Sequence, residues 1–195
     1  MPRAGLTTAI VTYEAGKLAD EVGFENLTLT ALALRLGVRQ PTLYKHVDGT
    51  AGLHRGMAIL AKTQMADMMR RAAVGRARDE ALVAIAIAYR TWATEHPGLY
   101  AATVRAATPG DVDDERAALE AVKVITDVLE GYGLSGDDAI DATRALRAML
   151  HGFVTLQSAG GFGYPVDADH SFLRAVEALI SAIARWQTSS HEKTE

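Results

Sequence analysis

Cysteine is absent from this sequence of 195 residues. The chain therefore cannot form disulfides, thiolate metal sites or a thiol-based redox sensor. It also lacks any run that approaches the roughly 20 uninterrupted apolar residues of a membrane span, and Met1–Thr8 lacks the apolar run of a secretion signal. These absences predict a cytoplasmic protein whose function does not use cysteine chemistry.

An overall positive charge is missing as well. The 20 Lys and Arg face 24 Asp and Glu, for a formal net charge of -4, which excludes a protein that coats nucleic acid through bulk charge. Between Thr28 and Arg55, however, four Lys and Arg accompany a single acid, Asp48. Affinity for nucleic acid would have to come from this local patch. The hydrophobic fraction of 49% supports the folded core of one domain or two.

A short helix is predicted directly after Thr28, which occupies its N-cap position. Gly37 follows the last apolar residue and can take the left-handed conformation that ends a helix. Between them, apolar residues recur at helical spacing: Leu29, Leu32, Ala33 and Leu36.

A second short helix is predicted over Gln40–His46, so that the pair forms a helix-turn-helix. Pro41 falls in its first turn, where a proline loses no hydrogen bond. Two turns are too short to be stable alone, so this helix must pack through Leu43 and Val47. Its other face is polar and suits base edges and phosphates in a major groove. That face holds Gln40, Thr42, Tyr44, Lys45 and His46, with Arg35, Arg39 and Arg55 around it.

Some of these residues also allow a purely structural interpretation. Tyr44 can be mainly a packing residue with an exposed hydroxyl, and Pro41 is as much a helix starter as a base contact. His46 and His54 are eight residues apart, which no helical metal spacing produces. No metal is therefore expected.

The segment GFENLTLTALALRLGVRQPTLYKHVDGTAGL resembles the DNA-binding domain of the TetR family of bacterial transcriptional regulators. The resemblance rests on a glycine before L-T, then A-x-x-L-G-V, then T-L-Y-x-H, in that order. It implies double-stranded DNA as a partner. Thr30 departs from the arginine of some members, and Thr50 from the lysine of many. The predicted DNA-binding residues are Thr28, Thr30, Arg39, Gln40, Pro41, Thr42, Tyr44, Lys45, His46 and Thr50.

Helical periodicity continues along the chain, so the predicted fold is all-α with about nine helices. Residues 1–50 are expected to form a DNA-binding domain, helix 51–75 a connection, and residues 51–190 a regulatory and dimerisation domain. A capping box is predicted at Ser135 and Asp138. The connecting helix is expected to pack through Leu53, Met57, Leu60, Gln64 and Met68. The other helices are predicted at 7–22, 78–96, 98–107, up to about 130, 136–158 and 168–187.

The phrase W-A-T-E-H-P-G-L-Y, with the later pair His151 and Gly152, is similar to a C-terminal regulatory domain in one branch of the TetR family. A mostly apolar pocket for a small molecule is expected there. An alternative is that its aromatic residues simply belong to the core and that His96 caps a helix end. The predicted ligand-binding residues are Tyr89, Trp92, His96, Tyr100, Met149, His151, Phe153 and Gln157.

The last two predicted helices are apolar over a broader arc than one neighbour requires. The resemblance implies that they pair with the same helices of a second copy in a four-helix bundle, forming a homodimer. Alternatively, they close a monomeric core. The predicted dimer residues are Leu146, Leu150, Phe153, Val176, Leu179, Ile180 and Ile183.

The predicted function is a sequence-specific transcriptional regulator, a repressor that a small apolar effector releases from a palindromic operator. One alternative is a DNA-binding regulator without a ligand. Another is an all-helical enzyme or carrier that uses His96, His151 or the acidic cluster Asp113–Glu115. Against an enzyme, the sequence has no metal-ligand spacing, no nucleophile beside a base and no cofactor fingerprint. Neither catalytic residues nor a cofactor are predicted.

Overall fold

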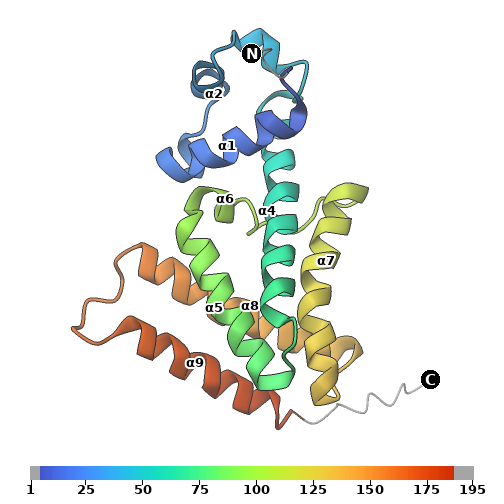
Figure 1. The fold of residues 1–195 in the computed structure, drawn as a ribbon, viewed down its shortest axis with the longest axis vertical. Helices are drawn as coiled ribbons and strands as arrows, with labels where there is room; N and C mark the ends of the chain where they lie inside the picture. The colour runs from blue at the N-terminus through green and yellow to red at the C-terminus, as the bar shows by residue number, and fades with distance from the viewer. Residues whose placement is uncertain (1–4, 187–195) are drawn as a thin grey trace. The chain divides into compact units, whose positions relative to one another are not determined.

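The computed structural model describes residues 5–186, and within that range the chain is entirely helical and irregular, with no strand (Figure 1). The all-α prediction of about nine helices is confirmed. The helices, with two short 3-10 turns, are α1 (Thr8–Val22), η1 (Phe24–Asn26), α2 (Leu29–Leu36), α3 (Gln40–Leu43), α4 (Gly49–Ala73), α5 (Arg78–Glu95), α6 (Pro97–Ala101), α7 (Val112–Leu129), η2 (Glu130–Tyr132), α8 (Gly136–Ser158) and α9 (Ala168–Ile183).

The chain divides into two compact units. The first unit combines the residues up to Met65 with Glu95–Glu120, and the second combines Ala66–Thr94 with the residues from Ala121 onward. The first unit therefore contains α6 as well as the three N-terminal helices. A functional division at residue 50 stays a prediction.

Local interactions define the helix ends of the first unit as the sequence predicts. The Thr28 hydroxyl accepts a hydrogen bond from the backbone N–H of Ala31 at 3.1 Å and so caps α2. Gly37 ends α2 at φ 65°, in the left-handed region. The N–H of Val38 then donates to the carbonyl of Ala33 at 3.0 Å, which satisfies a carbonyl at the helix end.

The second helix of the pair is shorter than predicted. Regular α3 ends at Leu43, and residues 44–46 continue as a turn. In that turn the N–H groups of Lys45 and His46 donate to carbonyls three residues earlier, a tighter geometry than that of an α-helix. The prediction of packing is confirmed, since Leu43 is fully buried and Val47 is 7% exposed.

The buried line along α4 also differs from the predicted one. Leu53 and Met57 are fully buried as expected, but Leu60, Gln64 and Met68 are only half-buried. The buried line instead runs through Leu53, Met57, Ala61, Met65 and Met69. Because four residues turn a helix by about 400°, this line advances about 40° at each step and winds around α4.

The second unit has its core between α8 and α9. Phe172 and Val176 of α9 are buried, as are Leu146 and Leu150 of α8. The bounds predicted for α8 are those observed. The predicted capping box is wrong, because the Ser135 side chain makes no capping hydrogen bond.

Candidate DNA interface and regulatory residues

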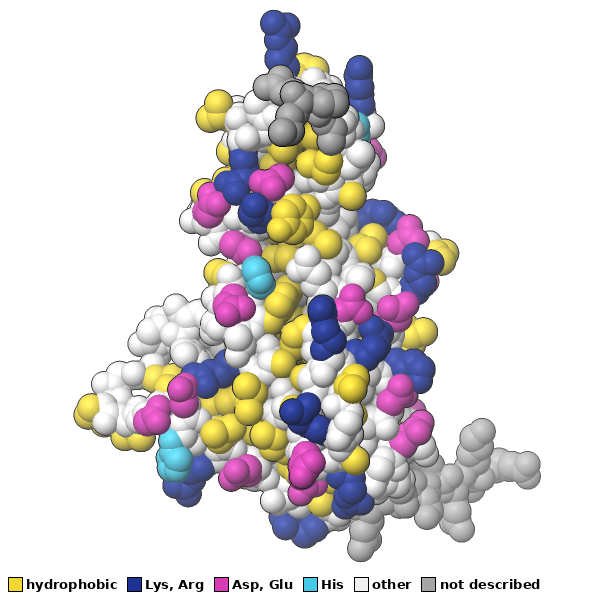
Figure 2. Space-filling view, in the orientation of Figure 1, with side chains coloured by type: hydrophobic (Ala, Val, Ile, Leu, Met, Phe, Trp, Pro, Cys, Tyr) yellow, Lys and Arg dark blue, Asp and Glu magenta, His cyan; other side chains and the backbone are white. Residues whose placement is uncertain are grey.

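The polar side chains of the predicted recognition segment, residues 39–46, lie at the surface of the first unit. Tyr44 is 56% exposed, which argues against the interpretation of this residue as mainly a packing residue. Arg39, Pro41 and Lys45 are also exposed, whereas Gln40, Thr42 and His46 are partly covered. Figure 2 shows basic side chains that project outward from the surface of the first helices.

Only part of the basic patch is available to a nucleic acid. Arg35 is paired with Glu14 through Nε at 3.0 Å and with Glu21 through Nη1 at 2.8 Å. The bond to Glu21, followed by the bond to Glu14, raises the pKa of Arg35, and the bond to Arg35 is the main cause that lowers the pKa of Glu14. The charge of Arg35 is therefore largely balanced within the first unit.

Arg55 is balanced in the same way. Its Nε and Nη2 each lie 2.5 Å from a carboxylate oxygen of Asp111, and Nη2 lies 3.3 Å from Asp113. The bond to Asp111 is the main cause that raises the pKa of Arg55, and the bond to Arg55 is the main cause that lowers the pKa of Asp111. Of the four cations between Thr28 and Arg55, only Arg39 and Lys45 have no ion pair within residues 5–186.

Two contacts hold the recognition segment in place. At its start, the Thr30 hydroxyl donates to Oε1 of Gln40 at 3.2 Å. The amide N–H₂ group of Gln40 then stays available for an outside acceptor. At its end, the Thr8 hydroxyl donates to the backbone carbonyl of His46 at 3.1 Å. The segment is thus bonded both to α2 and to the first residue of α1.

The flanking threonines have different roles. Thr28 is exposed but its hydroxyl oxygen caps α2, whereas Thr50 is exposed in the first turn of α4. That turn contains no acidic residue. The free amides of a helix N-terminus attract phosphate, so the start of α4 suits a DNA backbone even without the lysine that many TetR members carry.

A further contact within the first unit joins α6 to α1 (Figure 1). Asp20 accepts a hydrogen bond from the backbone N–H of Leu99 at 2.9 Å, and its other oxygen lies 3.0 Å from Nδ1 of His96. His96 is the N-cap residue of α6. The histidine-proline pair thus lies at a helix start against α1, not at the free end of α5.

The predicted ligand-binding residues are divided between the two units. His96 and Tyr100 belong to the first unit, and the other six belong to the second. Tyr89, Trp92 and Tyr100 are buried. The four from α8 are half-buried: Met149, His151, Phe153 and Gln157.

Arg90 of α5 is a residue that sequence reasoning missed. Its Nε donates to Oε1 of Gln157 at 2.8 Å, and its Nη2 lies 2.7 Å from Asp169. Its guanidinium lies over the rings of Phe153 and Phe172, 5.4 Å and 4.8 Å from the ring centroids. A signal was present in the sequence, because Arg90 is the single charged residue between Glu80 and Glu95.

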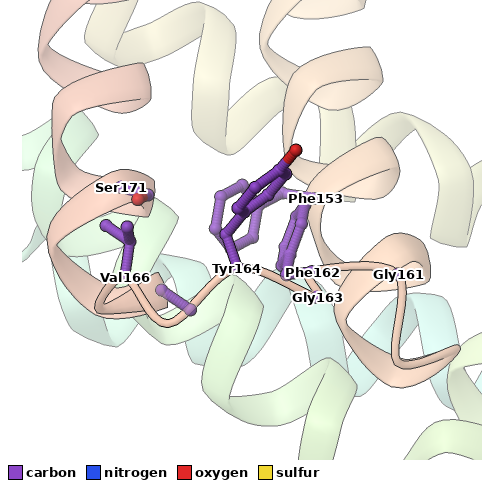
Figure 3. Close-up of a pocket in the computed structure, with 8 residues that line it drawn as sticks. Phe153, Gly161, Phe162, Gly163, Tyr164, Val166 and Ser171 are labelled. Carbon is purple, nitrogen blue, oxygen red and sulfur yellow. The ribbon is translucent and has the colours of Figure 1, made fainter.

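Phe153 also lines a cavity of about 250 Å³ at the end of α8 (Figure 3). Its ring lies 4.8 Å from that of Phe162, centroid to centroid, and Tyr164 and Val166 of the connector to α9 complete the apolar wall.

Comparison with known proteins identifies the family. Residues 82–179 match the family model described as the tetracyclin repressor-like C-terminal domain. The chain is 38% identical over 186 residues to the HTH-type transcriptional regulator Rv0681 of Mycobacterium tuberculosis, covering 95% of this chain and 85% of that protein. It is 31% identical to the HTH-type transcriptional regulator YobS of Bacillus subtilis, covering 93% and 95%. The chain belongs to the TetR family of transcriptional regulators.

Solved structures agree on the fold. A TetR variant of Acinetobacter baumannii AYE, crystallised with minocycline, has a TM-score of 0.72 at 24% identity and covers 93% of this chain and 98% of its own. The TetR regulator SCO7222 of Streptomyces coelicolor has a TM-score of 0.72 at 18% identity, with coverage of 92% and 98%. Because the family is shown by the two regulators of 38% and 31% identity and by the family model, the chain is a DNA-binding regulator with a helix-turn-helix, and the enzyme hypothesis is wrong.

Within this TetR-family chain, most of the residues predicted at a dimer interface are already covered. Leu146, Leu150, Val176, Ile180 and Ile183 are at most 3% exposed in the single chain. Such side chains have almost no surface left to bury against a second copy. The sequence predicted that these apolar residues form the surface that contacts a second copy. In the structure they are instead buried in the core that contains α8 and α9.

Residues 5–186 of this TetR-family chain contain neither a membrane-spanning helix nor a metal-binding cluster. No described helix is long and apolar enough to cross a membrane. In the same part of the chain, histidines and carboxylates nowhere form a group of three that would hold a metal ion.

Proposed function

We propose that this TetR-family regulator is a repressor that binds a palindromic operator as a homodimer and is released by a small, mostly apolar effector. The observation that carries the DNA-binding part is the recognition segment, where Arg39 and Lys45 are the cations that no carboxylate of residues 5–186 balances. In this proposal Arg39 contacts a base edge beside Gln40, and Lys45 contacts a phosphate. Because one recognition segment has so few residues to contact bases, two copies are needed to recognise a specific DNA sequence.

A fluorescence anisotropy titration with DNA from upstream of the protein's own gene tests this part. Lys45→Ala should weaken binding to all sequences alike and lower the slope of log K against log salt by about one. Arg39→Ala should reduce the preference for the operator over random DNA, by about 1–3 kcal/mol. Arg71→Ala, an exposed arginine outside the recognition segment, is the matched control. Absence of binding to any such fragment at low salt would refute the proposal.

The homodimer is proposed through the outward face of α8 and α9. Ala148, Gly152 and Leu156 follow one another at spacings of four on α8, and Leu156 is 52% exposed. A Cβ added at Gly152 would meet no atom within 4 Å, so the single chain leaves room there for a close neighbour. Leu173 of α9, 36% exposed, adds apolar surface. To read a palindromic operator, the two recognition segments of such a dimer need to lie about 34 Å apart, the spacing of successive major grooves.

The effector is proposed to bind in the second unit, between α5 and α8. Tyr89 and Trp92 supply a buried aromatic surface, and the bonded pair of Arg90 and Gln157 supplies polar groups. Met149, His151 and Phe153, all half-buried on α8, complete the proposed set. An effector releases the DNA only if it binds the DNA-free arrangement of the dimer more tightly than the DNA-bound arrangement.

Native mass spectrometry of the purified full chain, followed by effector titration of the DNA complex, tests the effector. Gln157→Ala should raise the effector concentration needed for release and leave the affinity for DNA unchanged. If no molecule is retained and no candidate releases the DNA, the protein is instead the ligand-independent regulator considered as the alternative.

A further inference from the structure

The first unit contains a cavity of about 490 Å³ that shares no residue with the proposed effector site. Its wall comes from α4, from the start of η1, and from the segment that runs from the end of α6 to the first turn of α7. Five of its lining residues are alanines, so much of the wall is apolar with short side chains. The volume falls within the range of about 300–1,000 Å³ typical of small-molecule sites.

His54 also lines this cavity. Its Nε2 is buried and has no hydrogen-bond partner, and it is the single such side-chain atom found in the described part of the chain. The His54 ring packs against Phe24, and the two ring centroids are 4.6 Å apart. Because Nε2 has almost no accessible surface, the imidazole contributes to the wall as a ring and not as a hydrogen-bonding group.

The charges around the cavity are balanced except at one residue. Lys62 is 2.5 Å from Asp114, whose other oxygen accepts a hydrogen bond from the N–H of Thr108 at 3.0 Å. Arg55 is paired with Asp111, as described above. Arg105, in contrast, is an exposed lining residue with no ion pair or hydrogen bond to any residue in the range 5–186. The wall therefore presents one uncompensated positive charge.

We propose that this cavity binds a small aromatic carboxylate. Its carboxylate pairs with Arg105, and its ring packs against Phe24, His54 and the alanine wall. Phe24 opens the short turn that leads from α1 into the helix-turn-helix. The bound carboxylate therefore stabilises the DNA-binding unit directly, separately from an effector in the second unit.

Isothermal titration of the full chain with 1-naphthoate tests this inference without DNA. Binding should weaken roughly tenfold in Arg105→Ala, the loss expected for one charge-assisted hydrogen bond. It should remain unchanged in Arg116→Ala, an exposed arginine of the same unit that does not line the cavity. The neutral analogue 1-naphthylmethanol should bind more weakly than 1-naphthoate.

A second variant guards against indirect effects of the first. Ala58→Leu fills the cavity from α4 and should abolish binding, while circular dichroism verifies that the chain still folds. Equal binding to wild type and Arg105→Ala, or equal binding of the neutral analogue, would overturn the proposal. So would the absence of binding at millimolar 1-naphthoate. Because none of these readouts involves DNA, such a failure would leave the proposed repressor function untouched.

Discussion

Asp20 of α1 accepts a hydrogen bond from the backbone N–H of Leu99 at 2.9 Å. A side chain of the first helix thus satisfies an amide in the first turn of α6, 79 residues later in the chain. The same carboxylate contacts His96. The start of α6 is therefore positioned by α1 and not by its own sequence alone.

Replacing Asp20 should destabilise the protein by the loss of this cap. Asp20→Ala should lower the free energy of unfolding by about 1 kcal/mol, a typical value for a lost helix cap. Asp20→Asn keeps an oxygen acceptor for the Leu99 N–H and should lose less. Urea denaturation followed by circular dichroism measures both. Equal losses in the two variants would contradict a capping role for Asp20.

Gly98→Ala should be far more damaging, because Gly98 touches the backbone of α1. An added Cβ would lie 2.1 Å from the carbonyl carbon and oxygen of Ala19 and 2.6 Å from the backbone nitrogen of Asp20. Backbone atoms cannot rotate away as a side chain can, so α6 must move off α1. We expect a loss of more than about 2 kcal/mol. Gly163→Ala, where a Cβ meets nothing within 4 Å, should be nearly neutral in the same urea titration.

Lys62→Met should lower the free energy of unfolding, because it leaves Asp114 without its partner in a buried ion pair. The side chains of Lys62 and Asp114 are 8% and 6% exposed, so the single change leaves an uncompensated carboxylate inside the first unit. A loss of about 3–5 kcal/mol is expected. Adding Asp114→Asn removes the charge, keeps an acceptor for Thr108, and should restore most of the stability. Thermal unfolding of the single and double variants measures the difference.

The exposed pair of Lys123 and Asp127 on α7 offers a matched control. Its side chains are 66% and 51% exposed, so Lys123→Met should change stability by no more than about 1 kcal/mol. Comparable losses at Lys62 and Lys123 would mean that burial does not decide the effect.

Gly152→Trp should separate the proposed dimer without harming the single chain. A Cβ at Gly152 meets no atom within 4 Å in one copy, so the side chain can extend outward there, whereas a partner helix approaching closely would clash with it. Light scattering after size-exclusion chromatography should give twice the mass of one chain for wild type and the mass of one chain for the variant. A variant that stays dimeric would place the interface elsewhere.

The sequence by itself determined the features that depend on neighbouring residues. The Thr28 cap, the left-handed Gly37 and the inward Leu43 and Val47 follow from local hydrogen bonding and helical spacing. These features also carry the TetR motif, so the family and the exposed recognition segment were predictable.

Only the tertiary structure decided which side chains remain available for function. Arg35 and Arg55 count toward a basic patch in the sequence, but carboxylates 14 to 58 residues away neutralise them. Burial likewise removed Leu146 and Ile180 from the predicted dimer surface. The charge of Arg105, which no carboxylate within residues 5–186 compensates, emerges in the same way. Whether a charge is balanced, or an apolar face covered, depends on residues that periodicity along one helix does not identify.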